Sequence, residues 1–99
     1  MKKLLFLAGL PHSGTSLLDK LLDLHEEISS IVDYSKEQVD LIENSLDIFS
    51  SQNKLDEYIN QFIVEKDQYL LLKNPDNLEY LQQILSIKNY KCKILIIYR

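Results

Sequence analysis

The segment Gly9-Leu10-Pro11-His12-Ser13-Gly14-Thr15-Ser16 combines two glycines with three hydroxyl side chains, and this spacing is suited to binding an anion. Glycines let the backbone curl so that successive N–H groups converge at the start of a helix, where the helix dipole also favours negative charge. Thr15 stands where nucleotide hydrolases and kinases have the lysine that contacts the β and γ phosphates. The segment therefore predicts a phosphate-binding loop but disfavours hydrolysis or transfer of a γ-phosphate.

The residues on either side of this loop predict the strand and the helix that such a loop requires. Leu4 to Ala8 is a continuous apolar run, typical of a strand buried on both faces of a parallel sheet, and we expect it to be the central strand. From Gly14 to about His25 the apolar residues follow a helical period, with Asp19, Lys20 and Asp23 predicted to face water. The apolar positions of that helix are Leu17, Leu18, Leu21, Leu22 and Leu24.

The middle of the chain predicts further elements of both kinds. Ile28 to Tyr34 is a weak candidate for a second strand, with Ile31 and Val32 as its apolar part. Lys36 to Phe49 has apolar residues near one face of a helix, and residues 55–63 repeat that pattern after a polar turn. We therefore expect two amphipathic helices here.

The last third of the chain predicts strand, helix and strand again. Tyr69 to Leu72 is a short apolar run, and Asn74 can cap a helix whose first residue is Pro75. Lys93 to Tyr98 predicts the final strand, and Arg99 follows it. The alternation predicts an α/β fold: a three-layer α/β/α sandwich with a parallel sheet, of the P-loop nucleotide-binding type.

Composition excludes several classes of protein. Ninety-nine residues with 45% hydrophobic content suit one small globular domain. The net charge of −4, with no helix face rich in lysine and arginine, argues against nucleic-acid binding. The single cysteine, Cys92, excludes an intrachain disulfide and fits a cytoplasmic protein, in which we expect it to lie in the core. Two distant histidines predict no metal site.

Three motifs, in the same order, resemble the sulfotransferase family that uses 3′-phosphoadenosine 5′-phosphosulfate (PAPS). Leu7 to Leu18, LAGLPHSGTSLL, resembles the phosphosulfate-binding loop. Leu70 to Pro75, followed by Asn77-Leu78, is similar to the family's strand that ends in Lys-x-Pro. Lys93 to Arg99 resembles the strand whose terminal arginine binds the 3′-phosphate.

The resemblance implies a role for each matched position. Lys73 would face the sulfuryl group or the acceptor, and Arg99 would bind the 3′-phosphate. His12, where the family usually has Arg or Lys, would donate a hydrogen bond to the leaving group. No metal is implied. The residues that would hold the 5′-phosphosulfate are Pro11, His12, Ser13, Gly14, Thr15 and Ser16.

The general base and the acceptor stay open. The family commonly supplies a Glu or His after the second strand, which corresponds to Glu37 here, with Glu43 and His25 as alternatives. The acceptor is a carbohydrate, a protein tyrosine or a small alcohol or amine. Two other functions compete: a nucleotide kinase or related phosphotransferase in which Ser16 ligates Mg²⁺, and a noncatalytic nucleotide-binding or interaction module.

Family members continue well beyond the arginine that Arg99 resembles. We therefore expect residues 1–99 to be the N-terminal part of a single sulfotransferase-like domain, truncated and of little or no activity by itself. In that case the strand from Lys93 to Tyr98 would be an exposed apolar edge of the sheet. Self-association through this edge is the expected consequence.

Overall fold

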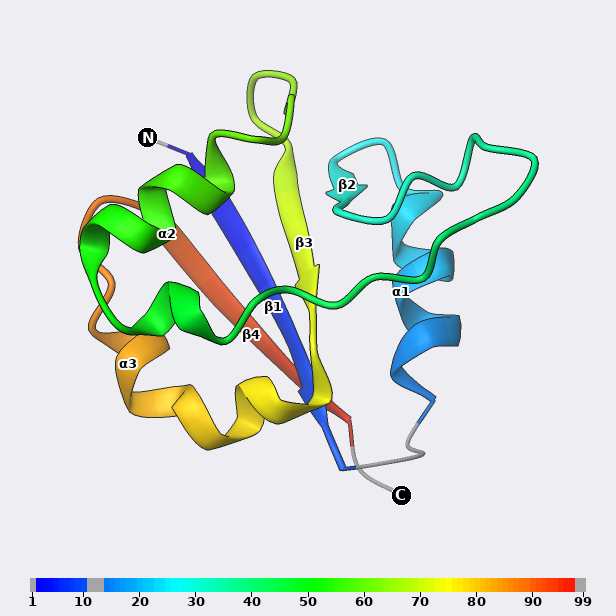
Figure 1. The fold of residues 1–99 in the computed structure, drawn as a ribbon. Coiled ribbons are helices and arrows are strands. Elements are labelled where there is room, and N and C mark those ends of the chain that lie inside the picture. The colour runs from blue at the N-terminus through cyan, green and yellow to red at the C-terminus, as the bar shows by residue number, and fades with distance from the viewer. Residues whose placement is uncertain (1, 11–13, 98–99) are drawn as a thin grey trace.

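Four parallel strands form the centre of the protein, whose computed structural model describes residues 2–10 and 14–97. They are β1 (Lys3–Gly9), β2 (Ile28–Ser30), β3 (Tyr69–Lys73) and β4 (Lys91–Ile97), arranged in the order β2-β3-β1-β4 (Figure 1). Strand β1 pairs with β3 on one side and with β4 on the other. The prediction of a parallel α/β fold with the first strand inside the sheet is confirmed, and β4 forms one edge.

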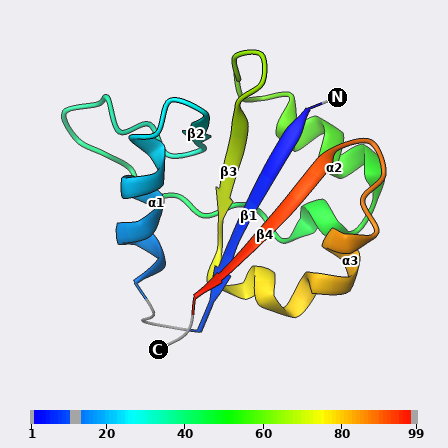
Figure 2. The same cartoon turned by 180° about the vertical axis from the view of Figure 1, so that it is seen from behind.

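Three α-helices and two 3-10 helices connect these strands in the described part of the chain. Helix α1 (Thr15–Asp23) lies on one side of the sheet. Helices α2 (Gln52–Ile59) and α3 (Leu81–Leu85) lie on the other side, as Figures 1 and 2 both show. The 3-10 helices are η1 (Asp47–Phe49) and η2 (Pro75–Tyr80). Among the described residues, no helix has the length and apolar character needed to cross a membrane.

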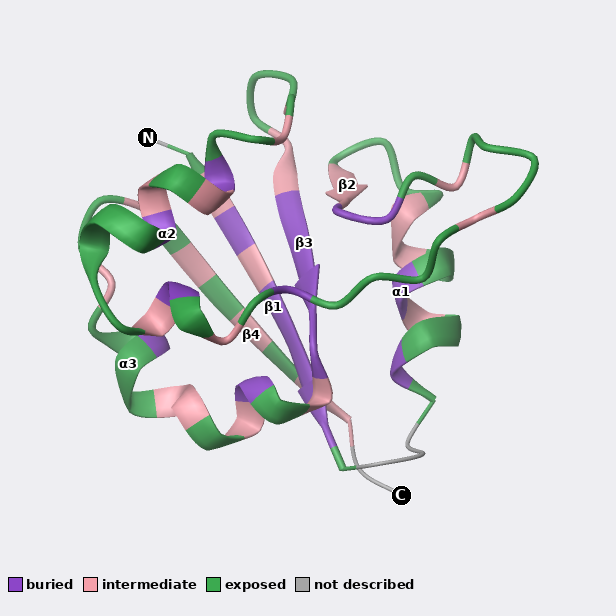
Figure 3. Ribbon diagram, viewed as in Figure 1, coloured by how far each residue is buried: buried purple, intermediate pink, exposed green. Residues whose placement is uncertain are grey.

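Side chains alternate between the two faces of the sheet along each strand. Most of β1 and β3 is buried, whereas β4 is intermediate or exposed (Figure 3). The even-numbered residues of β1 and β3 pack with α2, α3 and η1 into the main hydrophobic core. The odd-numbered Leu7 and Leu71 are also fully buried and lie on the opposite face, which carries α1. The main core consists of Leu4, Phe6, Ile31, Val32, Ile48, Leu55, Ile59, Leu70, Leu72 and Ile84.

Two buried asparagines fasten the long connection after β2 to the carboxyl ends of β1 and β3. Asn44 and Asn77 exchange amide hydrogen bonds in both directions, each 2.9 Å long. Asn77 also donates to the Leu7 carbonyl at 3.1 Å. The Asn44 amide N–H donates to the Lys73 carbonyl at 2.9 Å, and the Asn74 side chain donates to the Asn44 carbonyl at 2.8 Å. These bonds fix the backbone on both sides of Lys73.

The helix predicted from Lys36 to Phe49 is wrong. Only its last three residues, η1, are helical, and residues 39–45 form no regular element. The physical reason is that the Asn44 backbone hydrogen-bonds to the end of β3 and not to its own neighbours. Leu41 and Ile42, which a helix would have turned toward the core, are 61% and 41% exposed.

Other boundaries differ less from those predicted. Strand β2 ends at Ser30, although Ile31 and Val32 beyond it are buried as expected of apolar residues. Pro75 does begin a helix capped by the Asn74 side chain, but its first turns are 3-10 in type. Cys92 packs half-buried against the core, and this burial raises the pKa of its thiol to about 11. A thiol with that pKa is a core residue and not a reactive nucleophile.

The asparagine pair makes a prediction about stability. Asn77→Ala leaves the buried Asn44 amide without its partner and removes a bond to the Leu7 carbonyl. We expect the free energy of unfolding, measured by urea titration, to fall by about 3 kcal/mol because buried polar groups lose their partners. Asn53→Ala, an exposed position in α2, should change it by less than about 0.5 kcal/mol. Equal effects of the two substitutions would contradict this account.

Candidate anion-binding site

The first turn of α1 has the features of a candidate anion site. Gly14, the residue before the helix, has φ of 88°, a left-handed conformation that residues with a side chain rarely adopt. It supplies no side chain to cap the helix, and the first turn contains no acidic residue. The first N–H groups of a helix have no partner within the helix, and its dipole adds partial positive charge there. Thr15 is buried beside them, while Ser16 is exposed.

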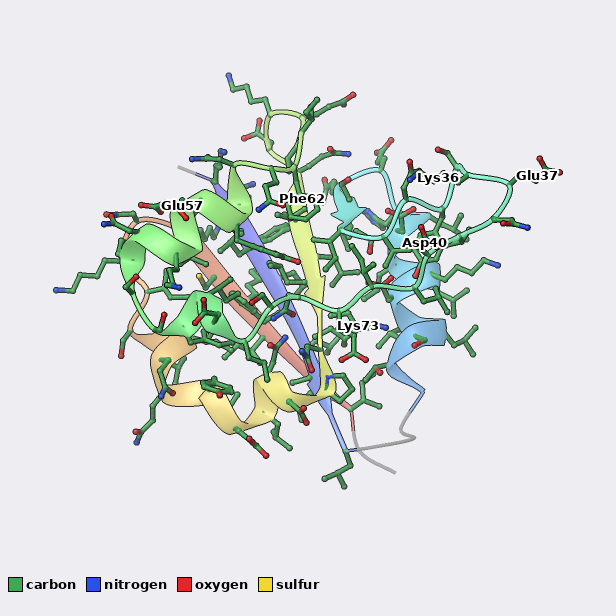
Figure 4. The ribbon with its side chains drawn as sticks, in the orientation of Figure 1. Lys36, Glu37, Asp40, Glu57, Phe62 and Lys73 are labelled. Carbon is green, nitrogen blue, oxygen red and sulfur yellow. The ribbon has the colours of Figure 1, made fainter. Side chains whose placement is uncertain are left out.

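Lys73 brings a buried positive charge to the same place. It is the last residue of β3, only 3% exposed, and its Nζ donates to the Ser16 hydroxyl at 3.2 Å. Among the described residues no carboxylate lies within 4.0 Å of this ammonium, because the one ion pair found there joins Lys54 and Asp47 on the surface. The strand end and the helix start thus form a compact cationic and hydroxyl-bearing site. Figure 4 shows Lys73 extending from β3 toward α1.

Asp19 is buried, so the prediction that it faces water is wrong. Its carboxylate is fully inaccessible and accepts hydrogen bonds from the Ser30 hydroxyl, at 2.9 Å, and from the Tyr34 hydroxyl. Thr15 and Asp19 thus share the inward side of α1 with the half-buried Leu18 and Leu22, and the two hydroxyls stabilise a charge that apolar packing could not. Burial raises the pKa of the Asp19 carboxyl, although both hydroxyls and the positive charge of Lys73 act in the opposite direction.

The hydrogen bond between Tyr34 and Asp19 also affects the pKa of Tyr34. Burial, together with the hydrogen bond to Asp19, raises the pKa of the Tyr34 phenol well above its ordinary value. The phenol therefore stays protonated and donates to Asp19. This bond holds the connection after β2 against α1, close to the first turn of that helix.

The residues predicted to form the site fall into three groups. Gly14, Thr15, Ser16 and Lys73 come together between α1 and β3. Pro11, His12, Ser13 and Arg99 lie outside the described residues. The three candidates for the general base, Glu37, Glu43 and His25, are exposed.

Glu37 lies at the outer bend of the connection after β2, and its side chain points away from Lys73 (Figure 4). His25 follows the far end of α1, and its Nδ1 accepts the Glu27 amide N–H. At 1.5 Å of rise per residue, the helix separates His25 from Ser16 by more than about 10 Å. None of the three candidates reaches the Lys73 ammonium by a hydrogen bond within the described structure.

Sequence reasoning missed Asp19 and Tyr34 as neighbours of this site. A signal did exist for Asp19, since Thr15 and Asp19 are four residues apart and so occupy one helix face. The sequence nevertheless predicts that Asp19 faces water, because it groups with the charged Lys20 and Asp23 outside the leucine stripe. Tyr34 had no such signal, because its meeting with Asp19 depends on the path of a connection without regular structure.

A cavity of about 290 Å³ opens beside the site. Ser16 contributes to its wall, most of which is apolar. Leu17, Lys20, Tyr34, Val39 and Leu41 complete the lining. In the described residues no group of three or more His, Cys, Asp or Glu side chains is arranged to hold a metal ion.

The conformation of Gly14 makes a prediction about the loop. A Cβ at this position would meet no atom within 4 Å, so only the backbone conformation opposes a side chain. Gly14→Ala should lower the free energy of unfolding by about 1 kcal/mol because an alanine is strained at positive φ. Gly14→Asn, which tolerates this conformation better, should lose less than Gly14→Ala in the same urea titration. A loss as large for asparagine would point to a different cause.

The buried carboxyl makes a prediction about pH. Because burial raises the pKa of Asp19 above 3.8, the folded protein keeps a proton that the unfolded chain has already lost. The contribution of Asp19 to stability therefore falls as pH rises from 3.8 to the raised pKa, and is constant above it. Asp19→Asn removes this titration, so the free energy of unfolding of the parent minus that of the variant should decrease across this window. A difference that increases with pH would mean that attraction to Lys73 dominates over burial.

Comparison of the chain with protein-family models, with curated proteins and with solved structures found no match. The likeness to sulfotransferases is therefore carried by the three motifs described above. Support for a function therefore comes from the contact between Lys73 and Ser16 and from the first turn of α1.

Proposed function

We propose that this chain binds PAPS and belongs to a protein that transfers its sulfuryl group to a hydroxyl or amine acceptor. The observation that carries the proposal is the 3.2 Å hydrogen bond from the buried Lys73 ammonium to the Ser16 hydroxyl at the start of α1. Strand β1 comes before Gly14, and helix α1, which contains Ser16, begins directly after it. This order of strand, glycine and helix is typical of P-loop folds. The placement of α1 opposite α2 and α3 supports a three-layer α/β/α sandwich of this type.

The proposed chemistry uses positive charge and hydrogen-bond donors without a metal ion. When the sulfur–oxygen bond to the phosphate breaks, negative charge grows on the bridging oxygen. The Ser16 and Thr15 hydroxyls, the first N–H groups of α1 and the Lys73 ammonium would stabilise that charge. His12 would add a donor at the leaving oxygen, and Arg99 would bind the 3′-phosphate.

The acceptor would approach through the cavity beside Ser16. Its apolar wall, formed in part by Leu17, Val39 and Leu41, suits the carbon skeleton of a small molecule. The acceptor hydroxyl would then lie near Ser16 and lose its proton to a base. Glu37 is the proposed base because it follows the second strand, where the resemblance implies this residue, and Glu43 and His25 are the alternatives.

Two other functions stay in competition. In a kinase, Ser16 would ligate Mg²⁺, but its hydroxyl oxygen already accepts a hydrogen bond from the Lys73 ammonium, and that positive charge repels a cation at the same place. This observation favours PAPS over a metal nucleotide. A noncatalytic nucleotide-binding module would keep the same anion site and differ only in the absence of turnover.

Nucleotide titration tests the proposal. Adenosine 3′,5′-bisphosphate should bind without a metal, as measured by isothermal titration calorimetry, and ATP with Mg²⁺ should not displace it. Lys73→Met keeps most of the side-chain volume and removes the charge, so we expect affinity to fall by about 10- to 100-fold. Lys54→Met removes a surface lysine and should leave affinity unchanged.

Circular dichroism of both variants controls for loss of folding. Binding of ATP that requires Mg²⁺, with no response to the bisphosphate, would replace the proposal by the kinase. Bisphosphate binding that is retained in Lys73→Met would remove its central residue. Binding of the bisphosphate is the deciding measurement, because it tests the anion site directly.

A further inference from the structure

Helix α1 presents an exposed leucine stripe on the side away from its own sheet. Leu17, Leu21 and Leu24 are 65%, 54% and 79% exposed, and their spacing places them on one face of the helix. The buried Thr15 and Asp19 occupy the opposite face. Three large apolar side chains in a row form a contact surface and are not scattered single residues.

A second uncovered surface lies on the same side of the sheet. Helix α1 packs on β2, β3 and β1, while β4 lies at the edge beyond them (Figure 2). Register pairs Leu5 with Lys93 and Leu7 with Leu95, so these β4 side chains share the face that carries α1. Lys93 is exposed and Leu95 is 38% exposed. This β4 face is basic near the start of the strand and apolar toward its end.

Charges on the two surfaces are complementary along the strand direction. Glu26 and Glu27 are exposed and immediately precede Ile28, the first residue of β2. Ile28 lies level with Tyr69, Lys3 and Lys91 in the register of the four strands. The two glutamates after α1 and the two lysines at the start of the β4 face are therefore at the same level along the strand direction.

The lysines near that row form no ion pair with the residues that the structure describes. Lys3 and Lys93 place their ammonium groups 5.3 and 5.2 Å from the centre of the Tyr69 ring. Among the described residues, neither these two lysines nor Lys91 forms an ion pair with a carboxylate. The cluster therefore has donors available for carboxylates from outside.

We propose that the occupant of both surfaces is a second copy of this chain. A two-fold axis parallel to the strands places the leucine stripe of each α1 on the β4 face of the other copy. Such an axis preserves the strand direction, so Glu26 and Glu27 of each copy meet Lys91 and Lys93 of the other. Each α1 then lies between two sheets, and the contact is isologous.

Sedimentation velocity of residues 1–99 tests this arrangement through the leucine stripe. Leu21→Gln should raise the dimer dissociation constant by about 100-fold, since each dimer loses two buried leucines worth about tenfold each. Leu85→Gln, a 77% exposed position on α3 across the sheet, should leave the constant unchanged. A dimer that persists in Leu21→Gln would overturn the proposal and favour association through the β4 edge.

Charge reversal provides the second, sharper test. Lys93→Glu or Glu27→Lys alone places like charges across the interface, and each should raise the dissociation constant by about tenfold. Both substitutions in one chain restore opposite charges and should return the constant to near the parent value. Failure of the double variant to recover, or a monomer at every concentration that can be reached, would overturn the proposal.

Discussion

Asn44 and Asn77 bury two amide side chains where the strands end, and each satisfies the other. Their hydrogen bonds to the backbone join three segments that are distant in sequence: the end of β1, the turn after β3 and the connection after β2. A buried amide without a partner is costly, so this arrangement tolerates little variation. It also explains why residues 39–45 follow a path without regular structure, although the spacing of their apolar residues predicts a helix.

The position of Lys73 follows from that clamp. Its carbonyl accepts the Asn44 amide N–H, and its side chain leaves the strand toward α1, where Ser16 accepts from its ammonium. An ammonium that is almost fully buried needs compensation, and Asp19 provides it from the next turn of α1 without direct contact. Because Ser30 and Tyr34 satisfy the Asp19 carboxylate, the Lys73 charge stays available for an anion at the helix N-terminus. Stability and the proposed chemistry thus share the same side chains.

Helix α1 consequently differs from a typical surface helix, because it buries two polar residues beside the half-buried Leu18 and Leu22 and leaves its other leucines exposed. The face toward the sheet contains Thr15 and Asp19, while Leu17, Leu21 and Leu24 face outward. The buried polar residues belong to the site between the helix and the sheet. An apolar outer face is explained by a partner surface, and the basic and apolar face of β4 on a second copy has the matching chemistry.

The sequence by itself determined the elements whose signals are local. The apolar run Leu4 to Ala8 predicts a strand, and Gly14 and the Asn74-Pro75 pair each predict a helix start from a few neighbouring residues. These three predictions are confirmed. Tertiary structure alone decided which helix face is buried, where the connection after β2 runs and that Lys73 meets Ser16. The physical reason is that apolar periodicity records how hydrophobic a face is, whereas a buried polar face is stabilised by partners such as Ser30, Tyr34 and Asn77 that lie far away in the chain.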